Sequence, residues 1–243
     1  MIESVWAAIW WGGFAAFSLM IGYFLATRKL SNRTIGIVMG IGAGALISAI
    51  AYELVPESNL NGPYVLIAVG LGALAFFVGD WIVDRRGGAD RMNIPGNQPG
   101  GSGAAIFIGT LLDNIPESII LGMGLALGGV INWAFLTAVF ISNLPEGVAG
   151  TVNLENTGYS RRKIFRMWAA LVLVSAACAG LGYVTINLLP GAQGIYAKAF
   201  AAGAMLTMLA DAMMPEAFEH GGILVGLFTV LGFIMSATLS ILQ

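Results

Sequence analysis

Charged side chains are scarce in this sequence. They make up 10% of its 243 residues, whereas hydrophobic residues make up 58% and the mean hydropathy is +0.84. A soluble domain carries about 25% charged residues, so this composition cannot build a hydrated surface for a chain of this length. It predicts a polytopic helical membrane protein embedded in membrane lipid. The net charge of -2, without a basic patch, gives no indication of nucleic-acid binding.

Cysteine and histidine each occur only once, as Cys178 and His220. A single cysteine excludes an internal disulfide bond and any metal site built from several thiolates. A catalytic zinc site of the His-Glu-x-x-His kind needs more imidazoles than this chain has, which argues against an intramembrane metalloenzyme, and we expect no enzyme. No nucleotide-binding motif is present, so neither ATP nor an organic cofactor is expected.

Long apolar runs fill most of the chain. A bilayer core of about 30 Å needs about 20 apolar residues per helix, and counting on that rule predicts an all-α membrane protein with eight transmembrane helices. The chain, 1–243, is then a single transmembrane domain, and Gly221-Gly222 is the turn before its last span. The predicted spans are residues 4–27, 34–56, 63–83, 104–128, 132–154, 166–190, 195–219 and 221–241.

Basic residues are concentrated in three loops of this topology. These loops follow the first, third and fifth spans, and with eight spans they all fall on one side of the membrane. Because lysine and arginine mark the cytoplasmic side, the loop 84–103 is predicted to be cytoplasmic, and both termini to lie outside the cell membrane. Lys198 is the exception among the 11 basic residues, and we expect it to snorkel to the outer interface.

Two segments of the chain can be aligned without a gap. Residues 44–57 end the second predicted span, residues 203–216 end the seventh, and both segments finish in Pro-Glu. The second span runs outward and the seventh inward. The chain is therefore predicted to contain an inverted 3+2+3 repeat, in which spans one to three match spans six to eight around a central pair. Inverted repeats with interrupted helices are typical of secondary transporters.

The central pair of spans carries two similar polar motifs in apolar surroundings. Asp113-Asn114-Ile115-Pro116-Glu117 lies in the fourth span and Ser142-Asn143-Leu144-Pro145-Glu146 in the fifth. In each motif the first and last residues are four apart and share a helix face. A carboxylate at the middle of the membrane costs about 2.5–3.5 kcal/mol on insertion scales. No lysine or arginine lies near these motifs in the spans to offset that cost.

A bound cation would offset it. A proline inside a helix frees the carbonyl four residues earlier, which here belongs to Leu112 or Ile141. Carboxylate, amide and carbonyl oxygens are suitable ligands for divalent metals. Protonated carboxylates would instead indicate a proton-linked carrier of an organic solute, and a metal-binding sensor that no longer transports is a further alternative. The predicted metal ligands are Asp113, Asn114, Glu117, Ser142, Asn143 and Glu146.

On these two motifs, Asp-Asn-Ile-Pro-Glu-Ser and Ser-Asn-Leu-Pro-Glu-Gly, the chain resembles the ZIP (Zrt-/Irt-like) family of divalent-metal transporters, of the bacterial or archaeal type. The resemblance implies eight spans with both termini outside, a homodimer, and uptake of a metal, zinc first, by alternating access through a site between helices four and five. Carried over, it implies one site of Asp113, Glu117, Ser142 and Glu146, beside a second of Asn114, Glu117 and Asn143.

The chain departs from that family at several ligand positions. Asp113 stands where the family usually has histidine, and Ser142 stands where it often has histidine or glutamine. Some members add an acidic ligand from helix six, but this chain has no Asp or Glu between Asn156 and Ala210. An all-oxygen site is harder than one with imidazole, so manganese, iron and magnesium gain on zinc as substrates. Cadmium and cobalt complete the set of metals expected.

Acidic residues near the ends of two spans predict a path to and from this site. Glu53 and Glu57 are four apart at the outer end of the second span, where they could attract cations to an entrance. Two interfacial carboxylates in water are an equally good explanation of that pair. The residues that could pass an ion to the cytoplasm lie at the inner end of the seventh span: Asp211, Glu216, Glu219 and His220.

Overall fold

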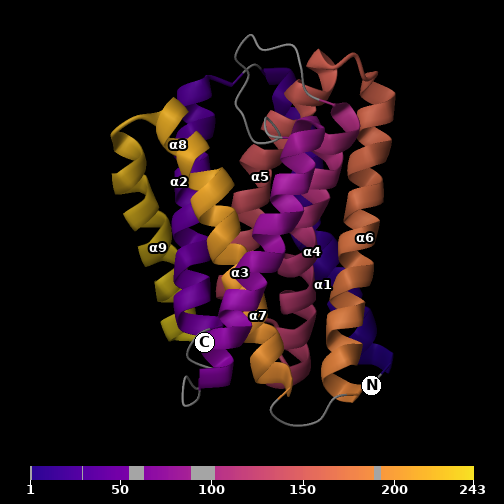
Figure 1. Cartoon of the computed structure of the whole chain (residues 1–243), viewed down its shortest axis with the longest axis vertical. Coiled ribbons are helices and arrows are strands. Elements are labelled where there is room, and N and C mark those ends of the chain that lie inside the picture. Colours follow the sequence, from indigo (N-terminus) through magenta and orange to yellow (C-terminus); the bar gives the residue numbers. More distant parts are fainter. Residues whose placement is uncertain (1, 29, 55–62, 89–101, 189–192) are drawn as a thin grey trace.

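The computed structural model describes residues 2–28, 30–54, 63–88, 102–188 and 193–243. Within these ranges all regular structure is helical, and eight helical stretches are long and apolar enough to cross a membrane. The helices stand side by side in one bundle, and the first and last helices place the chain ends at the same end of it (Figure 1). The predicted all-α class and the eight spans are therefore confirmed. In keeping with the predicted topology, the end with the termini is called the outer end.

The helix bounds lie close to the predicted ones. Gly222, with φ +67°, makes the turn before the last helix at the predicted place. The loop 84–103 is described only at its ends, because residues 89–101 lie outside the described ranges. In chain order the elements are α1 (Ile2–Leu25), η1 (Ala26–Arg28), α2 (Asn32–Ala49), η2 (Ile50–Leu54), α3 (Pro63–Val83), η3 (Asp84–Gly88), α4 (Gly103–Gly128), α5 (Trp133–Asn156), α6 (Arg161–Leu188), α7 (Gln193–Met208), η4 (Leu209–Met213), α8 (Met214–Gly221) and α9 (Leu224–Leu242).

The short connection between α4 and α5 is set by local sequence. Gly129, in the left-handed conformation at φ +70°, ends α4 and donates its N–H to the carbonyl of Leu125 at 3.0 Å. Asn132 begins α5, where its side-chain oxygen accepts a hydrogen bond from the N–H of Phe135 at 2.8 Å. The two motif helices are therefore antiparallel and consecutive, with their polar motifs at similar depth.

Glycines hold α1, α4, α5 and α6 together as one group. α4 packs against α6 at Gly122 and Gly182, and α1 packs against α5 at Gly22 and Gly147. A Cβ added at any of these glycines would meet backbone atoms of the neighbouring helix. α1 also packs along α6. Small residues that allow such close approach are the usual basis of helix packing in membranes.

A second group contains α2, α3, α7, α8 and α9. Gly44 of α2 faces the carbonyl of Thr229 in α9, and Gly203 of α7 faces the carbonyl of Val69 in α3. A Cβ at either glycine would overlap that oxygen. Gly44 and Gly203 hold the same place in the two aligned segments. Each helix pair also has a reciprocal contact. Gly232 of α9 packs on the backbone of Ile41 in α2, and Gly72 of α3 packs on the backbone of Phe200 in α7.

π-helical turns interrupt the second and seventh spans at equivalent places. They are η2 and η4, and Ile50, the first residue of η2, is aligned with Leu209, the first residue of η4. A π turn contains one extra residue and is frequent at functional sites. The π turns and the close glycine contacts occupy equivalent positions in the two aligned segments. The inverted repeat itself stays a prediction from the sequence.

The two groups meet where α2 passes α5. A Cβ at Gly42 of α2 would lie 2.8 Å from Cα of Ser142, so the α2 backbone touches the start of the α5 motif. Apolar side chains from both groups form one buried cluster, which includes Leu46 of α2, Phe135 of α5 and Met205 of α7. The polar motif of α5 is thus placed at the boundary between the two groups.

Candidate metal centre

The six predicted ligands come together in the interior of the bundle. α4 and α5 each supply three of them, from near the middle of the helix. Their relative exposures lie between 1% and 3%, so three carboxylates and their polar neighbours are removed from solvent and lipid alike. Buried charge of this kind requires compensation by a proton or a cation. The six are Asp113, Asn114, Glu117, Ser142, Asn143 and Glu146.

A directed series of hydrogen bonds orients the two asparagines. The backbone carbonyl of Thr110 can only accept, so Nδ2 of Asn114, which lies 3.0 Å away, must be the atom turned toward it. Oδ1 of Asn114 then accepts a hydrogen bond from Nδ2 of Asn143 at 3.1 Å. Because the amide nitrogen of Asn143 is used in this way, its oxygen points in the other direction, toward the carboxylates.

Three acceptor oxygens converge as a result. Oδ1 of Asn143 lies 3.3 Å from Oε2 of Glu117 and 3.3 Å from Oε2 of Glu146. Turning the amide over would let its nitrogen donate to both carboxylates, but its oxygen would then lie 3.1 Å from Oδ1 of Asn114, another acceptor. The bond from Asn114 to the Thr110 carbonyl opposes the turned amide, and a cation or a proton held between the three oxygens makes the converging arrangement the more stable one. Oxygens from two carboxylates and an amide, held this close, form a set that a divalent cation completes.

Asp113 and Ser142 occupy the first positions of the two motifs. Asp113 lies one helical turn before Glu117 on α4 and interacts electrostatically with it. Ser142 donates its hydroxyl to the carbonyl of Val139 at 2.9 Å, so it can offer a cation only its oxygen lone pairs. Pro116 and Pro145 lie inside continuous helices.

Two further buried polar residues lie on the same face of α4 and were not predicted. Thr110 anchors Asn114 through its carbonyl and donates its own hydroxyl to the carbonyl of Ile106 at 3.2 Å. Ser118 is likewise buried, directly after Glu117. Positions 110, 113, 114, 117 and 118 have the spacing of a single helix face. Extending the motif by that spacing would have found both residues.

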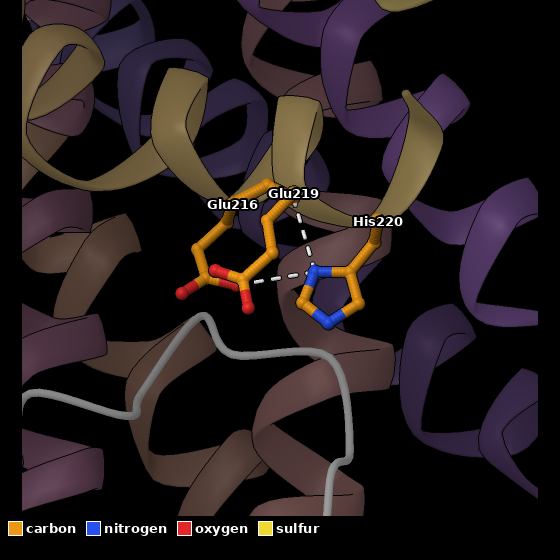
Figure 2. A group of neighbouring side chains, drawn as sticks. All are labelled: Glu216, Glu219 and His220. Carbon is orange, nitrogen blue, oxygen red and sulfur yellow. Dashed lines mark hydrogen bonds and ion pairs between the residues drawn. The ribbon is translucent and has the colours of Figure 1, made fainter.

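The structure brings together three of the four residues predicted for the exit. Figure 2 shows Glu216, Glu219 and His220 side by side on α8, and one ligand atom from each lies within 4.8 Å of the others. Nδ1 of His220 lies 3.2 Å from the carbonyl of Glu216 and 3.4 Å from Oε2 of the same residue. Asp211 is exposed on η4 and is not part of this group.

At the outer end the structure corrects one expectation. Lys198 is only 4% exposed and interacts electrostatically with Glu53, so the prediction that it snorkels to the interface is wrong. α7 packs beside η2, so Lys198 and Glu53 lie on neighbouring elements inside the bundle, and the hydropathy of a single span could not predict this. Glu53 also accepts hydrogen bonds from Nδ2 of Asn132 and from Oγ of Ser240. Glu57 lies outside the described residues.

No protein-family model matches the chain. The chain is 25% identical, over 202 residues, to the Arabidopsis thaliana protein named "Putative zinc transporter At3g08650". The match covers 79% of this chain but 31% of that relative, so the chain spans about a third of the relative's length.

Proposed function

We propose that this protein transports a divalent metal cation across a membrane, through a site formed by α4 and α5. The observation that carries the proposal is the convergence of Oδ1 of Asn143 with the buried carboxylates of Glu117 and Glu146, at 3.3 Å from each. The similarity to a protein named for zinc transport supports metal transport in general, and a transporter rather than an enzyme.

The ligands divide into charged and neutral ones. Asp113, Glu117 and Glu146 supply the negative charge, while Asn114, Asn143 and Ser142 complete the oxygen shell. Three mid-membrane carboxylates cost roughly 8–10 kcal/mol if the insertion costs are additive, and a divalent cation compensates two of their charges. Zinc is the first substrate proposed. Manganese and iron compete with it, because the ligand set contains only oxygen.

We further propose uptake into the cytoplasm by alternating access. The glycine contacts make α1, α4, α5 and α6 one tightly packed group, and the proposed site lies on this group where it meets α2 of the other. Movement of one group against the other would expose the site first to the outside and then to the cytoplasm. The inverted repeat, the cell-membrane location and the ZIP-like homodimer belong to the same proposal.

Metal uptake into proteoliposomes tests it. Purified protein is assayed with zinc, manganese, iron, cobalt and cadmium, and Glu117→Ala should abolish the flux that the wild type supports. Glu155→Ala is the matched control on α5, since Glu155 pairs with Arg161 at the surface and should be dispensable. The proposal fails if the folded wild type moves none of these metals. Zinc binding without flux would then favour the sensor, and solute flux without metal the proton-linked carrier.

A further inference from the structure

Lys198 is a buried positive charge in a protein proposed to carry positive ions. With Glu53, Asn132 and Gln243 it lines a cavity of about 110 Å³ at the outer end of the bundle. A water molecule takes about 30 Å³ in the liquid, so the cavity has room for a few waters or for an ion that keeps part of its hydration shell. Among the described residues that line it, Glu53 and Lys198 are the charged ones.

The polar wall of this cavity joins the two helix groups. Glu53, on η2 of the second group, accepts hydrogen bonds from Asn132 at the start of α5 and from Ser240 on α9. Beside it, the N–H of Trp133 donates to Oε1 of Gln243 at 2.9 Å. Ser240 therefore holds the Glu53 carboxylate from within its own group, while the bonds from Asn132 to Glu53 and from Trp133 to Gln243 cross the boundary that alternating access would have to open.

The cavity also lies in line with the metal site. Leu121, Gly124 and Gly128 line it, and they follow Glu117 along α4 by about one, two and three helical turns. Buried apolar side chains, Leu121 of α4 and Phe135 of α5, form the part of its wall nearest the site. An ion that enters here meets Glu53 and Lys198 first, then an apolar layer, and then the carboxylates of the two motifs.

We propose that Lys198 is a specificity-determining residue of transport, because its ammonium group is the resident counter-cation of Glu53 and an entering ion must displace it. This inference rests on the proposed function, since it takes the cavity as the entrance. At equal distance a divalent ion attracts Glu53 twice as strongly as the ammonium group does, whereas a monovalent ion gains nothing by the exchange. The pair therefore discriminates by charge before an ion reaches α4, and it lowers the affinity measured from outside.

Uptake kinetics test the displacement. Lys198→Met keeps the length of the side chain but removes the competing charge, so the KM for zinc uptake should fall about tenfold, which corresponds to 1.4 kcal/mol of lost competition. Lys198→Arg keeps the charge and should stay near the wild-type value. Lys163→Met makes the same replacement at an exposed lysine of α6, near the opposite end of the bundle, and should leave KM unchanged.

Zinc binding tests the same residue without transport. In a Glu117→Gln/Glu146→Gln background, adding Lys198→Met should increase the zinc bound per protein, and adding Glu53→Gln should remove that increase. This measurement separates the two proposals. If the wild type moves no zinc, the proposed function fails. A Glu53-dependent gain of binding in Lys198→Met would still establish the ammonium group as the counter-cation.

Two results overturn the inference. An unchanged KM in Lys198→Met removes the role in transport. If zinc binding shows no Glu53-dependent gain, Lys198 is not the counter-cation of Glu53. The same conclusion follows if the KM for zinc uptake is still lowered in the double variant Lys198→Met/Glu53→Gln. If Lys198→Met is not monodisperse in detergent, Lys198→Gln is put through the same two measurements.

Discussion

Asn143 of α5 donates a hydrogen bond to Oδ1 of Asn114 of α4 at 3.1 Å, and with this bond in place the oxygen of Asn143 points toward the carboxylates. The carbonyl of Thr110 fixes Asn114 in turn. The orientation of a ligand on one helix is thus set by the backbone of the other. A site assembled in this way depends on residues that carry no charge as well as on its carboxylates.

Asn114→Leu should weaken zinc binding although it removes no carboxylate. Leucine preserves the approximate volume but cannot hold the amide of Asn143, which is then free to present its nitrogen to Glu117. Loss of an orienting partner typically costs about 10–100-fold in metal affinity, so the KM for zinc uptake should rise by about that factor. Asn187→Leu, at an exposed position of α6, is the matched control. Equal effects of the two changes would contradict the proposed role.

Gly42→Ala should destabilise the protein and reduce uptake together. A Cβ at Gly42 would lie 2.8 Å from Cα of Ser142, and neither atom belongs to a side chain that can turn away. Overpacking of this kind costs about 1–3 kcal/mol, which thermal unfolding in detergent can measure. Gly70→Ala, on α3 with no neighbouring atom within 4 Å, should not lower the melting temperature. If Gly42→Ala melts like the wild type, the two groups do not meet as described.

Gly44→Ala and Gly203→Ala should lower the melting temperature by similar amounts. Each new methyl group would overlap a carbonyl oxygen of the neighbouring helix, Thr229 in one case and Val69 in the other. Gly226→Ala, whose added atom reaches only ordinary van der Waals contact with Phe218, is the control. Strongly unequal losses from the first two substitutions would count against the structural equivalence that an inverted repeat requires.

His220→Gln should slow release of the metal rather than its capture. His220, Glu216 and Glu219 belong to α8, which lies at the end of the bundle opposite the termini (Figure 1). We expect the maximal rate of zinc uptake to fall several-fold while KM stays near the wild-type value. Asp211→Asn, outside this group of three, should have the smaller effect. A raised KM in His220→Gln with an unchanged rate would place His220 on the entry side instead.

The spans could be predicted from the sequence because hydropathy and charge are properties of single segments. The eight apolar runs, the turn at Gly222 and the shared face of Asp113 and Glu117 all follow from local spacing. Burial of Lys198 could not be predicted in this way, since Glu53, with which it interacts electrostatically, comes from a span far away in the chain.

The asparagine network and the π turns could not be predicted from local sequence spacing. Thr110 takes part through its carbonyl, which every residue has, so its identity carries little information about that role. The π turns depend on one extra residue accommodated by tertiary packing, and no residue type marks η2 or η4 in the sequence. Their equivalent positions become visible only once the aligned segments are compared in three dimensions.

The π turns also set the direction in which later side chains point. Each residue of an α-helix rotates the side-chain direction by about 100°, and a π turn holds one residue more than an α turn. Glu216 and His220, which come after η4, therefore point about that angle away from where an uninterrupted helix would aim them. Deleting Ala210 would turn both away from the direction that Figure 2 shows. Inserting or deleting one residue in this span would therefore change the direction of the Glu216 and His220 side chains, which a substitution would leave in place.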